Sequence, residues 1–193
     1  MLNLTAALEA VIGDITLKME DFRHIDPSRV LVCVSSTRGS GIHGVYAKIH
    51  PLRFPGGERT TTVRRGLRTR TVAMPTITHR GVEMLYVIYF LVPRFMDLPF
   101  REKLITIFHE MFHISPSFDG DIRRFPGRNF AHGSSTKGYN GHMAKLADKY
   151  LDGLAEEHLL QFLHDDMEKT RSRHATIIGR KMPAPKLEVV REI

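Results

Sequence analysis

The sequence has little of what several protein classes require. Its single cysteine, Cys33, excludes an intramolecular disulfide framework and a zinc site built from cysteines. Its longest purely apolar run, Met84–Val92, is far shorter than the ~20 residues that a membrane-spanning helix needs. The N-terminal segment has no basic leader of the kind that begins a secretory signal. We therefore expect a cytoplasmic protein that has no membrane partner.

Internal repeats and low-complexity segments are also absent, and the composition is that of a folded chain. Apolar residues make up 42% and charged residues 25% of the 193 residues, which is ordinary for a globular protein and excludes wholesale disorder. This length fits one domain, which we expect over residues 1–167. Residues 168–193 mix Arg, Lys, His and Pro, so we expect a basic C-terminal tail that is ordered only if it docks.

Acidic residues are scarce in one basic segment. The formal net charge is +7, and residues 53–70 contain one acid, Glu58, among several arginines. These arginines are Arg53, Arg59, Arg64, Arg65, Arg68 and Arg70. Two interpretations stay open: a solvated basic hairpin, or a surface that contacts the phosphates of a nucleic acid.

Hydrophobic spacing indicates an α+β fold in which a small mixed or antiparallel sheet packs on an N-terminal helix and a second, motif-bearing helix. The strand over residues 83–92 is apolar on both faces and is expected in the centre of the sheet. Pro75 instead suggests an edge position for its strand, and Asp97 is expected to cap the second helix. The predicted helices cover residues 4–22, 97–114 and, as the C-terminal helix, 134–167, and the predicted strands cover 30–34, 45–50, 68–78 and 83–92.

The second predicted helix contains the motif H-E-x-x-H, from His109 to His113. Residues four apart on a helix project from one face, so the two imidazoles can converge on one metal ion. Glu110 follows the first histidine and lies to the side of this pair, where it can act as a general base on water. The spacing therefore predicts His109 and His113 as ligands of one zinc ion per chain, with Glu110 as the catalytic residue.

A catalytic zinc site normally has three protein ligands and one open position, so a third ligand is needed. His132 is the preferred candidate, because a chain that turns back after the first ligand helix can present it from the opposite side. His142, Asp119 and Asp121 remain alternatives, and the aspartates are equally suited to orient a ligand histidine. For a second donor to the developing oxyanion, the sequence leaves Tyr139, His142, Arg123 and Arg124 open.

The region around the motif resembles a known group of enzymes. His109–His113, a later His132-Gly and an aromatic residue on the following helix are similar to the compact zincin metallopeptidases, which include the SprT-type proteins. More narrowly, residues 112–118 resemble the H-E-[LI]-x-H-[IL]-x-P-x-F stretch of a phage-type metallopeptidase family. The resemblance implies a zincin-like fold, bound zinc and peptidase activity, with His109, His113 and His132 as ligands. The chain lacks the longer motif H-E-x-x-H-x-x-G-x-x-H of the metzincins, so it does not resemble that group.

These observations favour a zinc-dependent metallopeptidase that acts on a protein or peptide. Two other functions stay open: a nucleic-acid-binding module with a structural or vestigial zinc site, and a zinc hydrolase of non-peptide amides or esters. By analogy with zincins, the strand over 68–78 is expected to pair with extended substrate.

Overall fold

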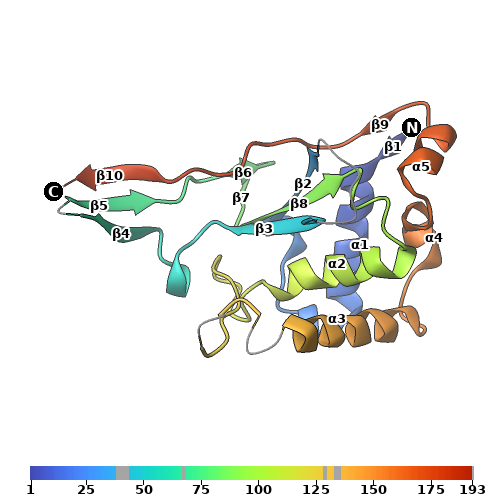
Figure 1. Cartoon of the computed structure of the whole chain (residues 1–193), viewed down its shortest axis with the longest axis horizontal. Coiled ribbons are helices and arrows are strands. Elements are labelled where there is room, and N and C mark those ends of the chain that lie inside the picture. Colours follow the sequence, from blue (N-terminus) through green and yellow to red (C-terminus); the bar gives the residue numbers. More distant parts are fainter. Residues whose placement is uncertain (38–43, 67, 128–129, 133–135, 193) are drawn as a thin grey trace.

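The fold is built around a mixed three-stranded sheet of order β2–β8–β3 (Figure 1). β8 (Tyr86–Val92) pairs in parallel with β2 (Val30–Ser36) and antiparallel with β3 (Ala47–Pro51). β8 is therefore the central strand, as its apolar sequence predicts, and β3 is an edge strand. The computed structural model describes residues 1–37, 44–66, 68–127, 130–132 and 136–192.

The sheet has a hydrophobic core on each face, because neighbouring residues of a strand point to opposite sides. On one face, alternate residues of β2 and β8 pack against α1 (Leu4–Lys18), α2 (Phe100–Phe112) and α3 (Thr136–Leu151). On the other face, the remaining residues of these strands, Cys33 among them, form a smaller core. This arrangement confirms an α+β fold in which the sheet packs on the N-terminal and motif-bearing helices.

The C-terminal residues, including those of the predicted tail, are ordered by docking on the rest of the chain. β9 (Ile177–Ile178) pairs in parallel with β1 (Leu2–Asn3). The Arg180 guanidinium donates to the carbonyl of Val32 and to the carboxylate of Glu9. Short elements precede β9: α4 (Glu157–Leu160), a 3₁₀ helix (Gln161–His164) and α5 (Met167–Arg173).

A second three-stranded sheet, of order β10–β5–β4, projects from this body (Figure 1). It consists of β4 (Thr60–Arg65), β5 (Arg68–Ala73) and β10 (Glu188–Glu192), all antiparallel. The prediction of an edge strand over 68–78 is wrong, since β5 is paired on both sides and ends before Pro75. A short hairpin of β6 (Thr78–His79) and β7 (Val82–Glu83) leads back into β8.

Several predicted helix boundaries also change. α1 ends at Lys18, and a separate 3₁₀ turn covers Glu20–Phe22. Asp97 does not cap α2, because the N-cap residue of this helix is Pro99. The Asp97 carboxylate instead accepts a hydrogen bond from the backbone N–H of Met167. Two further 3₁₀ turns cover Pro27–Arg29 and Pro55–Gly57.

The predicted helix over 134–167 is divided into several shorter helices. α3 begins the described part of this stretch at Thr136, and residues 134–135 lie outside the described residues. α3 ends at Leu151, close to Gly153, whose φ of 96° interrupts helical geometry. None of the described helices combines the length and apolar character that a membrane crossing requires.

Candidate metal centre

α2 places the H-E-x-x-H residues at its C-terminal end. The inner face of the helix is anchored by Phe108 and Met111, which are fully buried in the main core. His109 and His113 lie one turn apart on another face, with ring centroids 4.8 Å from each other. The helix ends at Phe112, and His113 is its C-cap residue. The histidine pair therefore sits where the chain leaves the helix for the following loop.

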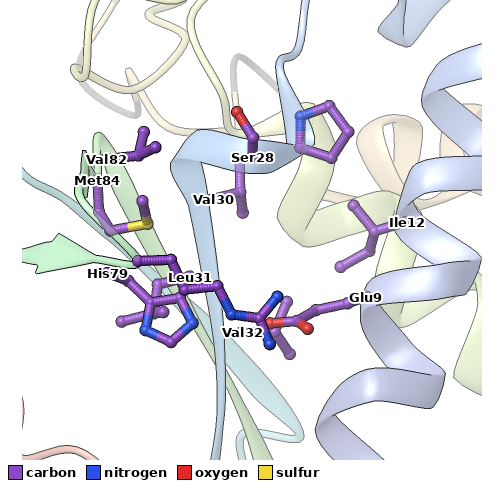
Figure 2. A pocket seen from close by; sticks show the side chains of 11 residues that line it. Glu9, Ile12, Ser28, Val30, Leu31, Val32, His79, Val82 and Met84 are labelled. Carbon is purple, nitrogen blue, oxygen red and sulfur yellow. The ribbon is translucent and has the colours of Figure 1, made fainter.

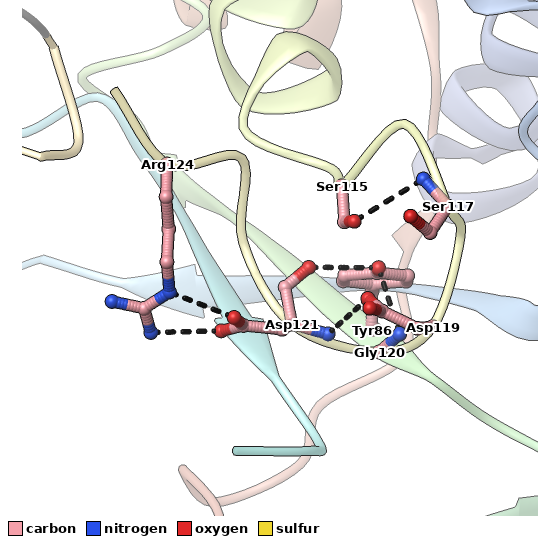
Figure 3. Close-up of polar contacts among 7 residues, drawn as sticks. All are labelled: Tyr86, Ser115, Ser117, Asp119, Gly120, Asp121 and Arg124. Atoms are coloured by element: carbon pink, nitrogen blue, oxygen red, sulfur yellow. Dashed lines mark hydrogen bonds and ion pairs between the residues drawn. The ribbon is translucent and has the colours of Figure 1, made fainter. Parts of the chain in front are cut away.

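This loop is held by the buried hydroxyl of Tyr86 from β8 (Figure 3). The Tyr86 hydroxyl donates to the carbonyl of Asp121 over 2.8 Å and accepts the N–H of Gly120 over 2.9 Å. The Asp121 carboxylate accepts two hydrogen bonds from the Arg124 guanidinium. The backbone N–H of Arg123 donates to the carbonyl of His113, so the return path of the chain is fixed beside the end of α2.

The return path brings His132 to the histidine pair. One ring nitrogen from each of His109, His113 and His132 can be chosen so that all three lie within 4.8 Å of one another. The Nε2 atoms of His109 and His132 are 3.2 Å apart. Two ligand atoms at about 2.05 Å from one zinc ion, at the tetrahedral angle, lie about 3.3 Å apart. The donor set and this separation both fit a zinc ion.

The electrostatics of the cluster also suit metal ligation, which requires neutral imidazole. Burial, with a smaller contribution from the neighbouring His132, lowers the pKa of His109 to about 4. Burial lowers the pKa of His113 to about 3, with smaller contributions from the two other histidines and Arg123. These two rings are therefore neutral at neutral pH and can offer nitrogen lone pairs.

Glu110 lies beside the cluster and is not a member of it. Its side chain is 6% exposed, and burial raises its pKa to about 8. The backbone N–H of Ile49 in β3 donates to this carboxylate, which opposes that rise. Glu110 thus extends from α2 towards the edge strand β3.

α3 contributes two further side chains to the centre. The Tyr139 ring lies 4.9, 5.5 and 5.0 Å from the rings of His109, His113 and His132, and its hydroxyl is 3.4 Å from the His109 carbonyl. The Asn140 side chain hydrogen-bonds the imidazole of His109 and can orient it. Asn140 and the Ile49 N–H are not among the predicted site groups, because no spacing in the sequence reveals contacts between these distant segments.

The alternative ligands serve other purposes in the described structure. His142 is exposed, and its ring packs on Phe112 at 5.2 Å. Asp119 accepts the N–H of Asp121, whose own carboxylate is paired with Arg124. None of the three joins the histidine cluster. Arg124, one of the two arginines considered as donors to the oxyanion, is held by its ion pair with Asp121.

Arg123, the other candidate donor, lies closer to the histidines. Its guanidinium stacks on Phe112 at 4.0 Å and donates to the Phe112 carbonyl. Burial lowers its pKa, so the group is partly withdrawn from water beside the cluster. These contacts hold Arg123 against the end of α2.

A groove of about 540 Å³ opens next to His109 and Glu110. It runs between the start of β3, the outer face of α2 and the N-terminal half of α3. Its walls combine apolar residues with a polar rim, and they include Tyr46, Ala47, Leu98, Arg101, Glu102, Ile105, Gly141 and Ala144. The groove is large enough for an amino-acid side chain together with its backbone.

A second cavity, of about 230 Å³, lies between α1, β2 and the β6–β7 hairpin (Figure 2). Glu9 and His79 are the acidic and imidazole groups that line it, and both contact the Arg180 guanidinium. None of the three clustered histidines lines this cavity. Its acidic and imidazole groups are therefore held by docking of the C-terminal segment.

Comparisons of the chain with protein-family models, with curated proteins and with solved structures find no match.

Proposed function

We propose that the protein is a zinc-dependent peptidase whose reaction centre is the cluster of His109, His113 and His132. One observation carries the proposal: three imidazole nitrogens can lie within 4.8 Å of one another, next to a buried carboxylate at the edge of a groove. Zinc bound there would supply a Lewis acid that lowers the pKa of water and polarises a carbonyl group.

Glu110 is the proton carrier in this proposal. Its pKa of about 8 in the ion-free protein reflects burial, and a cation held by the adjacent imidazoles favours the ionised form. The carboxylate can then take a proton from the attacking water and deliver it to the leaving amine. The Ile49 N–H, which favours the ionised form of this carboxylate, would help to orient it for both transfers.

Tyr139 is the best-placed second donor to the carbonyl oxygen as negative charge develops on it. Its ring contacts all three imidazoles, and its side chain is 7% exposed. Burial raises the pKa of its hydroxyl, with a smaller contribution from Glu110, so the hydroxyl keeps its proton at neutral pH. A protonated hydroxyl in a site of low polarity stabilises an oxyanion strongly.

The surroundings of the cluster favour a peptide as the substrate. β3 is an edge strand next to α2, and an extended peptide can add to such an edge through its backbone. We assign this role to β3 in place of the strand predicted over 68–78, which lies in the projecting sheet. The adjoining groove would receive an apolar side chain of the peptide.

The proposal is tested by Glu110→Gln, which keeps the shape of the side chain and removes its basicity. Zinc content and cleavage of casein and a mixed peptide library are measured together. We expect Glu110→Gln to retain zinc and to lose at least about 1,000-fold in hydrolysis. Glu102→Gln is the matched control, because Glu102 lines the same groove on the same helix but is 51% exposed.

Three outcomes would contradict the proposal. Undiminished hydrolysis by Glu110→Gln would exclude Glu110 as the base. Zinc-loaded wild-type protein that cleaves ester or simple amide reporters but no peptide would be a non-peptide hydrolase. Zinc-loaded protein inactive on all these substrates would indicate a structural metal site.

A further inference from the structure

The β4–β5 hairpin carries positive charge without acidic residues. Between Thr60 and Ala73 the sequence contains four arginines, five threonines and no Asp or Glu. The hairpin projects away from the helices and the central sheet (Figure 1). We infer that this projecting hairpin is a binding surface for duplex DNA, separate from the histidine cluster.

Not all arginines of the basic segment, residues 53–70, belong to the proposed binding surface. Arg53, at the start of the segment, is 6% exposed and pairs with Glu83. Arg59 pairs with the other carboxylate oxygen of Glu83 over 3.1 Å. These two arginines therefore support the fold. In the hairpin strands Arg64 and Arg68 are exposed and Arg70 is half-buried.

The strand register places these cations on both faces of the hairpin. Arg64 lies opposite Thr69, whereas Arg70 lies opposite Val63 on the other face. Arg68 shares the face of Arg70, because residues two apart in a strand point the same way. A ribbon with cations on both faces suits a groove bounded by two phosphate backbones. A flat anionic membrane would contact only one face.

The hairpin becomes narrower towards its tip. β10 pairs with β5 no further than Arg70, so the described hairpin beyond this point is two-stranded. The major groove of B-form DNA admits a two-stranded ribbon, whereas that of A-form RNA is too deep and narrow. Threonine hydroxyls beside the arginines can donate to phosphate oxygens. The shape and the charge of the tip therefore both favour duplex DNA.

The test compares two triple variants that remove the same charge. The hairpin variant is Arg64→Gln/Arg68→Gln/Arg70→Gln. The control variant is Arg23→Gln/Lys169→Gln/Arg171→Gln, which changes exposed cations on the body. Affinities for a fluorescent DNA duplex of about 25 base pairs are measured by anisotropy at several salt concentrations. Duplex RNA and phosphatidylserine vesicles are the other arms.

We expect the hairpin variant to bind the DNA duplex at least about 10-fold more weakly than the control variant. The slope of log K against log[salt] should become less negative by about 0.9 for each phosphate that the hairpin variant no longer neutralises. Equal DNA affinities of the two variants would overturn the inference. So would affinity that is independent of salt, or a hairpin-dependent affinity for RNA or vesicles that exceeds the affinity for DNA. Circular dichroism confirms that both variants fold, and none of these readouts requires peptidase activity.

Discussion

In the body of the molecule Lys103, Glu110 and His113 are buried on α2 and at its end, whereas in the projecting sheet Arg64 and Arg68 are exposed to water. Burial displaces the pKa of three groups on α2 towards the neutral form: the pKa of Glu110 is raised to about 8, that of His109 is lowered to about 4 and that of Lys103 is lowered to about 8. Arginine as a residue type is charged at every physiological pH.

This difference separates two kinds of molecular recognition. A buried group contributes through a defined position and a defined proton, so replacement of one atom can remove a function. Exposed cations act together through a field that salt screens, so each contributes a modest share. We therefore expect single substitutions to have large effects in the body and small effects in the hairpin.

The largest expected effect of a single substitution is the loss of bound zinc when one imidazole of the cluster is removed. His132→Ala removes one of three nitrogen donors, and we expect zinc to fall from about one equivalent per chain to below about one tenth after dialysis. Elemental analysis of the purified protein measures it. His142→Ala is the matched control, because His142 is a nearby exposed histidine outside the cluster.

The hairpin variant should bind as much zinc as the wild type, because its arginines lie outside the cluster. A loss of zinc in His142→Ala equal to that in His132→Ala would show that the ligands are different. Zinc retained in full by His132→Ala would remove His132 from the ligand set.

The parts of the molecule that the sequence predicts well depend on local patterns. The convergence of His109 and His113 follows from helical geometry alone, and the central position of β8 follows from apolar residues on both faces. His132 is the preferred third histidine because the chain turns back after α2, and the structure brings it to the pair. For the histidine pair and β8, a few neighbouring residues contain the necessary information; for His132 the sequence only favours one of several candidates.

The remaining features depend on segments that are distant in the sequence. β5 is flanked on both sides only because β10 arrives from the C-terminal end of the chain. Asp97 looks like a helix cap but accepts the N–H of Met167 instead. Asn140 reaches His109 only after α3 has packed on α2. No local pattern predicts such contacts.

A second prediction compares the effect on stability of adding a methyl group at two glycines, Gly120 in the loop after α2 and Gly141 on α3. Gly120 has a φ of 92°, and an added Cβ atom would lie 2.5 Å from the Cγ of Arg53. Gly120→Ala should therefore lower the free energy of unfolding by about 2–4 kcal/mol. Gly141→Ala is the control, because nothing lies within 4 Å of its added Cβ.

Gly141→Ala should raise the free energy of unfolding by about 0.5–1 kcal/mol, since alanine favours a helix. Urea unfolding of both variants and of the hairpin variant gives the three values. Each arginine substitution in the hairpin should change the stability by less than about 0.5 kcal/mol. A hairpin variant as unstable as Gly120→Ala would show that the projecting sheet is an integral part of the folded body.

The last prediction concerns the proton of Lys103. This side chain is 1% exposed, and its ammonium donates to the carbonyls of Leu163 and Asp165. Burial lowers its pKa to about 8 from an ordinary value of 10.5. Between these values the unfolded chain keeps a proton that the folded protein loses, so this group makes the free energy of unfolding increase with pH by up to about 1.4 kcal/mol per unit.

Lys103→Met removes this contribution, so the wild-type curve of stability against pH should rise more steeply than that of the variant between pH 8 and 10.5. Urea unfolding at several pH values measures both curves. The hairpin variant should keep the wild-type slope, because arginine does not titrate in this range. Parallel curves for wild type and Lys103→Met would show that Lys103 keeps its proton in the folded protein, and that burial in the body does not displace its charge.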